Sequence, residues 1–404
     1  MTGVDWSLEL ARAAEDMLPD LIGLRRVLHR DPEVGLHLPR TQRLVLESIE
    51  GLGLEVSTGL GSSSVTAVLR GELPGPTILL RADMDGLPLV EETGLDFASE
   101  NDAMHACGHD LHTAALIGAA RILAAERSRI RGDIVFMFQP GEEGYDGASV
   151  MIGEGVIEAS GSVPIAAYAA HVIPGPAGTF STRRGTLMAG TADLSVTMVG
   201  VGGHGSQPHT AVDPVVAIAE LVTALQVMVT RRFSVFDPVV VTVTQLSAGS
   251  AVNVIPDVAS LGATVRTLSR EADERLRREV SRLAKGIAAA HDCSVTVEFA
   301  ADYPVLVNDD TEADWVSGIL AETFGGERSV QQSDPLMASE DFSRVLEAVP
   351  GALILLGASP ADLDPADTEW NHSPRVRFDD AVLADLAAAL ATLAVRRLEL
   401  AAAD

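Results

Sequence analysis

The chain has 404 residues, of which 47% are hydrophobic, and it carries 57 acidic against 29 basic side chains, a formal net charge of −28 at pH 7. A chain of this length and apolar content can bury a large core and is long enough for two domains. The negative charge would repel nucleic-acid phosphates and anionic membrane surfaces, so we expect neither nucleic acid nor a membrane as partner.

The first twenty residues include Asp5, Glu9, Glu15 and Asp16 instead of a basic stretch followed by an apolar one, which predicts no secretory signal. The apolar run 386–395 is far shorter than a bilayer-spanning helix. The two cysteines make no disulfide scaffold in a chain of this size, which suits a reducing compartment. We therefore expect a cytoplasmic protein.

Three apolar runs in the first part of the chain, residues 77–80, 134–138 and 165–168, predict buried parallel strands. Helical patterns alternate with these runs as far as about Leu187, which is typical of a mostly parallel sheet covered by helices on both faces. Functional sites in such sheets lie beyond the carboxyl ends of the strands. The residues that follow each run are therefore candidates for a site.

The middle of the chain has a different pattern. The sequence Asp213-Pro214 predicts the N-cap and first-turn proline of a helix. A second helix carries Leu276, Val280, Leu283 and Ile287 on one face. Strands are expected at 192–199, 239–246, 259–267 and 294–299. The resulting order βαββαβ is that of a small split-βαβ, ferredoxin-like sheet.

After about Asp302 the α/β pattern returns, with 352–356 as a buried strand and an Ala-rich final helix. The sequence therefore predicts a two-domain α/β protein. Residues 1–187 and 302–404 would form one domain with a mostly parallel sheet, and residues 188–301 an inserted α+β domain. This arrangement explains how His372 can meet residues that lie far earlier in the chain.

Side chains typical of metal ligands follow the predicted strands. The set is Cys107, His109, Glu143, His171 and His372. A thiolate, imidazoles and a carboxylate suit divalent Zn²⁺ or Mn²⁺, with Co²⁺ and Ni²⁺ as possible alternatives. Five ligands are too many for one closed tetrahedral site. They predict two metal ions per subunit, roughly 3.5–4 Å apart and sharing a water.

Two pairs of carboxylates accompany these ligands. Glu142 and Glu143 are adjacent, so one can bind metal while the other takes a proton from the bound water. We assign Glu142 as the base and Glu143 as the ligand, although spacing alone leaves the reverse assignment open. Asp83 and Asp85 could bind metal directly or orient a ligand, and we favour the orienting role for Asp85.

The predicted inserted domain contains a glycine-rich segment, 200–205, that matches G-x-G-x-x-G. Dinucleotide binding is disfavoured because Pro208 intervenes before the next helix begins. We expect a flexible loop that presents His204. Asn253 and Arg266 lie in the same domain and suit a carboxylate, although each taken singly is an ordinary surface residue. The chain contains no G-x-S-x-G elbow, so a serine hydrolase has little support.

Together these motifs resemble the metal-dependent aminoacylases and amidohydrolases of the zinc-peptidase-like clan, which include hippurate hydrolase, N-acyl-amino-acid amidohydrolases and plant auxin-conjugate hydrolases. The resemblance runs nearly the whole chain. It is carried by HRDPE at 29–33, RADMDGLP at 81–88, HACGHDLH at 105–112, QPGEEG at 139–144, AHV at 170–172, GGHGS at 202–206, SEDF at 339–342 and NHSP at 371–374. Gly141 and Gly205-Ser206 stand where family members often have alanines.

The resemblance implies a two-metal catalytic domain with an inserted lid that also forms a homodimer. It implies the same five metal ligands as the spacing, with Glu142 as general acid/base. It further implies that His204 stabilises the oxyanion from the partner subunit, and that Asn253 and Arg266 hold the substrate carboxylate.

The expected reaction is hydrolysis of N-acyl amino acids, or similar small amide conjugates, to a carboxylic acid and a free amino acid. A metallo-carboxypeptidase or dipeptidase at the same site is the alternative within hydrolases. A non-catalytic, metal-dependent protein that binds acyl amino acids is the alternative from another class.

Overall fold

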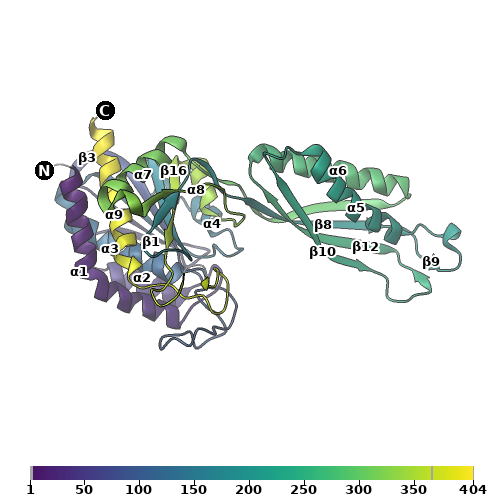
Figure 1. Cartoon of the computed structure of the whole chain (residues 1–404), viewed down its shortest axis with the longest axis horizontal. Helices are drawn as coiled ribbons and strands as arrows, with labels where there is room; N and C mark the ends of the chain where they lie inside the picture. Colours follow the sequence, from purple (N-terminus) through teal and green to yellow (C-terminus); the bar gives the residue numbers. More distant parts are fainter. Residues whose placement is uncertain (1–2, 365–366, 404) are drawn as a thin grey trace. The chain divides into compact units, whose positions relative to one another are not determined.

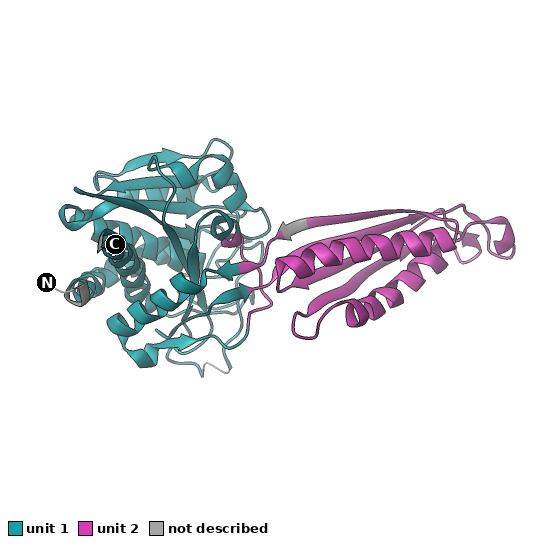
Figure 2. Cartoon of the chain, turned by 90° about the horizontal axis from the view of Figure 1, so that it is seen from above, with its two compact units in different colours: residues 1–187, 307–334, 344–404 teal, residues 188–306, 335–343 magenta. Residues whose placement is uncertain are grey.

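The computed structural model describes residues 3–364 and 367–403, which form two compact units (Figure 2). Unit 1 comprises residues 1–187, 307–334 and 344–404, and unit 2 comprises residues 188–306 and 335–343. The expected domain boundaries were 187/188 and 301/302. Residues 302–306 and 335–343, which we expected in the first domain, instead group with unit 2.

Unit 1 is built on an eight-stranded sheet with the order β1-β2-β4-β3-β5-β16-β6-β15. The strands are β1 (Glu55–Thr58), β2 (Val65–Arg70), β3 (Leu73–Asp83), β4 (Arg131–Gln139), β5 (Ala166–Ile173), β6 (Phe180–Thr182), β15 (Ser329–Gln331) and β16 (Gly351–Gly357). The central strands β4, β3, β5 and β16 are parallel, while β2 and β6 pair antiparallel with their central neighbours. The predicted mostly parallel sheet is therefore confirmed. Outside it, β7 (Gly185–Met188) pairs with β14 (Leu306–Asn308).

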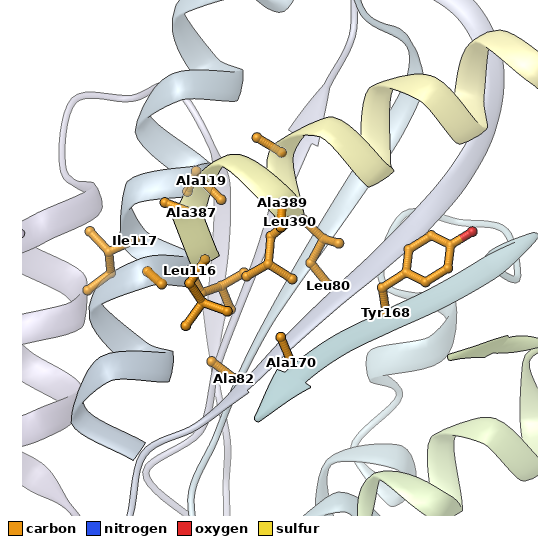
Figure 3. Close-up of a cluster of buried hydrophobic side chains, with 14 of the residues drawn as sticks. Leu80, Ala82, Leu116, Ile117, Ala119, Tyr168, Ala170, Ala387, Ala389 and Leu390 are labelled. Atoms are coloured by element: carbon orange, nitrogen blue, oxygen red, sulfur yellow. The ribbon is translucent and has the colours of Figure 1, made fainter. Parts of the chain in front are cut away.

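The helices of this part of the chain are α1 (Gly3–Arg30), α2 (Pro39–Ile49), α3 (His109–Ala125), α4 (Gly147–Gly153), α7 (Asp310–Phe324), α8 (Phe342–Ala348) and α9 (Val382–Ala403). Helices α3 and α9 pack side by side against the sheet, and α1 packs against both of them (Figure 1). Leu80 of β3, Leu116 of α3 and Leu390 of α9 meet in one buried cluster (Figure 3). Alanines such as Ala119 and Ala387 allow the helices to approach closely, which explains the Ala-rich composition of α9.

The topology collects polar residues at one edge of this sheet. Strand β3 ends at Asp83 and β4 ends at Gln139, just before the Glu142-Glu143 pair, while His171 lies near the end of β5. These strands are parallel neighbours, so their carboxyl ends lie together. Helix α3 begins there as well, at His109.

Gly108, the residue before α3, is needed for that start. Its φ angle is +85°, in the left-handed region that favours glycine. A Cβ at this position would also lie 2.2 Å from Cγ2 of Val172 on β5. The backbone between Cys107 and His109 therefore packs directly against β5.

Unit 2 has a four-stranded antiparallel sheet with the order β10-β12-β8-β13. Its elements are β8 (Gly190–Val199), β9 (Gly203–His204), α5 (Pro214–Arg232), β10 (Val239–Ala248), β11 (Val254–Ile255), β12 (Val258–Thr267), α6 (Arg270–Ala290) and β13 (Ser294–Tyr303). Helices α5 and α6 cover one face (Figure 1). The predicted ferredoxin-like order is confirmed, and Asp213 caps α5 through the N–H of Val215.

By length and composition alone, α5 is apolar enough to cross a membrane. Its Ile218, Leu221 and Leu225 side chains are buried in the core of unit 2. One side of this helix is therefore buried in unit 2, while Val216 and Val227 of the same helix are exposed.

Candidate metal centre

Three of the predicted ligands form a buried group in unit 1. A sulfur or nitrogen atom from each of Cys107, His109 and His171 lies within 4.8 Å of the others. The Cys107 sulfur is 3.4 Å from Nε2 of His171. Cys107 precedes α3, His109 opens it and His171 is on β5, so three neighbouring segments contribute one side chain each.

A second group consists of Cys107, Glu143 and His372, again with one potential ligand atom from each within 4.8 Å of the others. Nε2 of His372 is 3.0 Å from Oε1 of Glu143. Cys107 belongs to both groups. The five side chains predicted from the sequence to bind metal therefore meet around one sulfur atom.

The tautomers of two histidines suit metal binding. Nδ1 of His109 is 2.9 Å from the carbonyl oxygen of Asp85, and Nδ1 of His171 is 2.8 Å from that of Val172. A carbonyl only accepts, so each Nδ1 carries a hydrogen, and in the neutral ring each Nε2 keeps the lone pair that a metal needs. Nε2 of His109 is buried without a hydrogen-bond partner among the described residues. The residues present thus fit a divalent transition metal.

The charge balance at the second group also favours a cation. Cys107 and Glu143 raise the pKa of His372 to about 10. Burial, together with the charge of Glu143, raises the pKa of the Cys107 thiol. In the protein without metal, the His372 imidazolium therefore pairs with the Glu143 carboxylate, while Cys107 stays a thiol. Metal binding requires neutral imidazole and thiolate, so binding would release protons.

Asp85 orients the neighbouring groups. Its two carboxylate oxygens accept the backbone N–H groups of Glu142 and Glu143, each at 3.0 Å. Its backbone carbonyl accepts the Nδ1–H of His109. The Asp85 side chain is 1% exposed. Both carboxylate oxygens of Asp85 are thus engaged by the Glu142-Glu143 backbone, and the orienting role of Asp85 stays a prediction.

Glu142 lies beside the ligands and is 5% exposed. Its Oε2 is 3.9 Å from Nε2 of His109, and its carboxylate lies within 4.8 Å of ligand atoms of His109 and Glu143. A buried carboxylate at this distance is suited to exchange a proton with a water held among the ligands.

No role was assigned to His112 from the sequence, but the structure connects it to the site. Its Nδ1 is 2.6 Å from Oδ1 of Asp83, and its Nε2 accepts the backbone N–H of Val172 at 2.8 Å. Asp83 also accepts a hydrogen bond from Arg81 at 2.5 Å. The signal in the sequence was the spacing of three residues from His109, which places both rings on one side of α3.

His204 lies in unit 2 on β9, which pairs with β11 so that His204 is opposite Val254. The predicted flexible loop is thus a short two-stranded ladder. The N–H and hydroxyl of Ser206 lie 3.1 and 2.9 Å from Nδ1 of His204. Because the backbone N–H must donate, Nδ1 is the acceptor and Nε2 carries the hydrogen. The carbonyl of Asn253 accepts the N–H of Gly205, so Asn253 is close by.

Arg266 lies at the opposite end of the unit 2 sheet. On β12, Val258 is opposite Val199 and Arg266 is opposite Thr191, a separation of about 26 Å at roughly 3.3 Å per residue. The expectation that Asn253 and Arg266 hold the same carboxylate is therefore not met within one chain. The register of β12 separates them.

The chain is similar to known proteins over most of its length. The model of Peptidase family M20/M25/M40 matches residues 79–396. The chain is 34% identical over 393 residues to hippurate hydrolase of Campylobacter jejuni, covering 95% of this chain and 100% of that protein. It is 35% identical over 382 residues to thermostable carboxypeptidase 1 of Saccharolobus solfataricus, covering 93% of this chain and 95% of that protein.

Solved structures are similar over nearly the whole chain. One is a putative aminohydrolase from methicillin-resistant Staphylococcus aureus, with a TM-score of 0.90 and 34% identity over 96% of this chain and 99% of that one. Another is a dinuclear metal-binding M20 peptidase from Bacillus subtilis, with a TM-score of 0.81 and 31% identity over 95% of this chain and 99% of that one. Fold and site define a hydrolase that depends on two divalent metal ions. This chain belongs to Peptidase family M20/M25/M40.

Proposed function

We propose that this protein hydrolyses the amide bond of N-acyl amino acids, or similar small amide conjugates, to a carboxylic acid and a free amino acid. The observation that carries the proposal is the buried Glu142 carboxylate beside two ligand groups that share Cys107. Relatives support the substrate class, since hippurate hydrolase and the N-acetylcysteine deacetylase of Bacillus subtilis are each 34% identical to this chain.

The proposed ligands are Cys107, His109, Glu143, His171 and His372. The mixture of thiolate, imidazole and carboxylate favours Zn²⁺ or Mn²⁺, with Co²⁺ or Ni²⁺ as substitutes. Bound ions would polarise the substrate carbonyl and make a water more acidic. Glu142 would take the proton of the attacking water on its carboxylate and then deliver it to the departing amine nitrogen. Asp85 would keep the Glu142 backbone in place.

We assign His204 as the donor to the oxyanion. Its protonated Nε2 is free to donate because Ser206 occupies Nδ1. Arg266 lies far from His204 and Asn253 along the unit 2 sheet, which is consistent with a site completed by two subunits. We therefore propose a homodimer in which Arg266 of one chain binds the substrate carboxylate and His204 and Asn253 come from the other chain. We also propose a cytoplasmic location.

The experiment that tests the mechanism is Glu142→Gln. The amide keeps the shape but cannot carry the proton, so turnover should fall by roughly 10²–10⁴-fold while two metal ions remain bound. Glu143→Gln is the matched control. Because Glu143 is a proposed ligand, this variant should bind less metal, whereas the Glu142 variant should keep both ions. Near-normal activity of the Glu142 variant would show that the assigned base is wrong.

The substrate class is tested with a panel of N-acetyl, N-benzoyl and longer N-acyl amino acids, assayed after metal removal and after readdition of Zn²⁺, Mn²⁺ or Co²⁺. Amine release restored by metal is the expected result. Dipeptides belong in the same panel, because the similarity to a thermostable carboxypeptidase favours peptide hydrolysis as the second candidate. Release from peptides alone would replace the acyl-amino-acid assignment.

A further inference from the structure

We propose that Asn371 is a positioning residue of the metal centre, which joins the segments carrying three ligands and donates a hydrogen bond toward the Cys107 sulfur. The inference rests on the proposed roles of Cys107, His171 and His372 as ligands. It concerns a side chain that is itself neither a ligand nor a base.

The amide nitrogen of Asn371 faces three acceptors. Nδ2 lies 3.3 Å from the carbonyl oxygen of Cys107, 3.6 Å from the Cys107 sulfur and 3.2 Å from the carbonyl oxygen of Val172. An amide oxygen in that place would face only other acceptors, so these partners decide which end of the amide points to them. The amide oxygen Oδ1 is buried without a hydrogen-bond partner among the described residues. The nitrogen alone therefore anchors this side chain.

These acceptors belong to the ligand segments. Cys107 is shared by both ligand groups, and Val172 follows His171 and accepts the Nδ1–H of that ring at 2.8 Å. Asn371 itself precedes His372. One amide thus connects the backbone at or next to three of the five proposed ligands, although the segments lie far apart in the sequence.

The backbone of His372 adds a reason for such an anchor. Its φ angle is +72°, in the left-handed region, which costs a residue other than glycine roughly 1–2 kcal/mol. The N–H of His372 donates to the carbonyl of Ala106 at 3.0 Å. This bond and the Asn371 amide attach the loop at both residues to the Cys107 segment and hold the strained conformation that presents the His372 ring.

A hydrogen bond to the sulfur also affects how strongly a thiolate binds metal, because it withdraws charge from the donor atom. Groups that orient or hydrogen-bond metal ligands typically change metal affinity by about 10–100-fold when they are removed. We expect a change in that range when the Asn371 donors are lost.

The test uses Asn371→Asp and Asn371→Ala with Co²⁺ as the probe. The aspartate keeps the shape but turns an acceptor toward the three acceptors, while alanine removes the donors without adding charge. Affinity is measured by competition with a chromophoric chelator, and the sulfur-to-Co²⁺ charge-transfer absorption reports on Cys107. Both variants should bind Co²⁺ about 10–100-fold more weakly and shift that absorption.

Asn308 offers a matched control in unit 1. Its Nδ2 is 3.0 Å from Oγ1 of Thr182, 3.0 Å from the carbonyl of Arg183 and 3.3 Å from the carbonyl of Leu353. This clamp resembles that of Asn371, but it touches no proposed ligand. Asn308→Asp should lower thermal stability and leave Co²⁺ affinity and absorption unchanged.

The outcomes separate this inference from the proposed function. If the charge-transfer absorption is missing in the unaltered protein, or persists in Cys107→Ala, the ligand assignment is wrong. If the absorption depends on Cys107 but both Asn371 variants keep the normal Co²⁺ affinity and spectrum, the role of Asn371 is overturned. It is also overturned if Asn308→Asp weakens Co²⁺ binding as much, because general destabilisation would then explain the loss.

Discussion

Nδ1 of His112 lies 2.6 Å from Oδ1 of Asp83, and both side chains are fully buried. The bond joins the first turns of α3 to the end of β3, while the other ring nitrogen accepts the N–H of Val172 on β5. His112 therefore ties together three segments that carry or adjoin the proposed ligands.

Replacing His112 by Phe should destabilise the metal-free protein by roughly 3 kcal/mol, because the ring volume is kept while the Asp83 carboxylate and the Val172 N–H lose a buried partner. Urea unfolding measures the change. The exposed His37 provides the matched variant His37→Phe, which should stay within about 0.5 kcal/mol of the unaltered protein. Equal effects of the two substitutions would mean that the Asp83 contact adds nothing.

His105 should make stability depend on pH. Its two ring nitrogens are buried without partners among the described residues, and burial lowers its pKa to about 4. Between about pH 6.5 and pH 4, the His105 ring is protonated in the unfolded chain but stays neutral in the folded protein. The free energy of unfolding should fall over this window, by on the order of 3 kcal/mol from this residue.

The check is the slope of unfolding free energy against pH in the metal-free protein. His105→Phe should reduce this slope between about pH 6.5 and 4 by the contribution of His105, while that of His171, whose pKa burial also lowers, remains. His37→Phe should leave the slope unchanged. Burial would raise the pKa of Asp110, but Arg25 and His29 hold it far below its usual range. Carboxylates of this kind change the free energy of unfolding only below about pH 4. An unchanged slope in the His105 variant would contradict the buried, neutral state of this ring.

Metal binding should stabilise the protein and require Cys107. Metal at about 100 times its dissociation constant should add roughly 2.7 kcal/mol to the free energy of unfolding, and chelation should remove both that gain and the activity. Cys107→Ala should lower metal content and abolish the stabilisation. Cys293, the other cysteine, lies in unit 2 and allows the control Cys293→Ala. Metal analysis and thermal unfolding measure the metal content and stability of both variants. Full metal content in Cys107→Ala would refute the role of Cys107 as a ligand.

Gly108 should tolerate alanine poorly for two separable reasons. Its φ of +85° strains an alanine backbone, and the added methyl group would lie 2.2 Å from Val172. Gly155 has a similar φ of +90° but open space where the methyl group would lie, so it isolates the first reason. Gly155→Ala should therefore cost about 1–2 kcal/mol of backbone strain. Gly108→Ala should cost clearly more and also weaken metal binding, since the Cys107–His109 backbone must move. Similar losses in both variants would show that the contact with β5 is unimportant.

Much of this protein could be predicted from local sequence. Apolar runs mark the parallel strands, and the ligand-type residues follow them because strand ends are where backbone leaves the sheet and side chains become available. The βαββαβ order of unit 2 was equally visible, because a strand and a helix differ in the period of their apolar residues. The roles of the site residues, Glu142 and Glu143 included, stay predictions, although the contacts of Asp85 now explain how the two adjacent carboxylates are held.

The sequence by itself determined the fold class, the family and the set of chemically suitable ligands, because periodicity and motif spacing are properties of short segments. Only the tertiary structure decided that His112 and Asn371 serve the centre, since their partners lie on segments distant along the chain. It also decided that β12 carries Arg266 away from Asn253, and that residues 335–343 group with unit 2. These features depend on strand register and on contacts between remote segments, which local patterns do not encode.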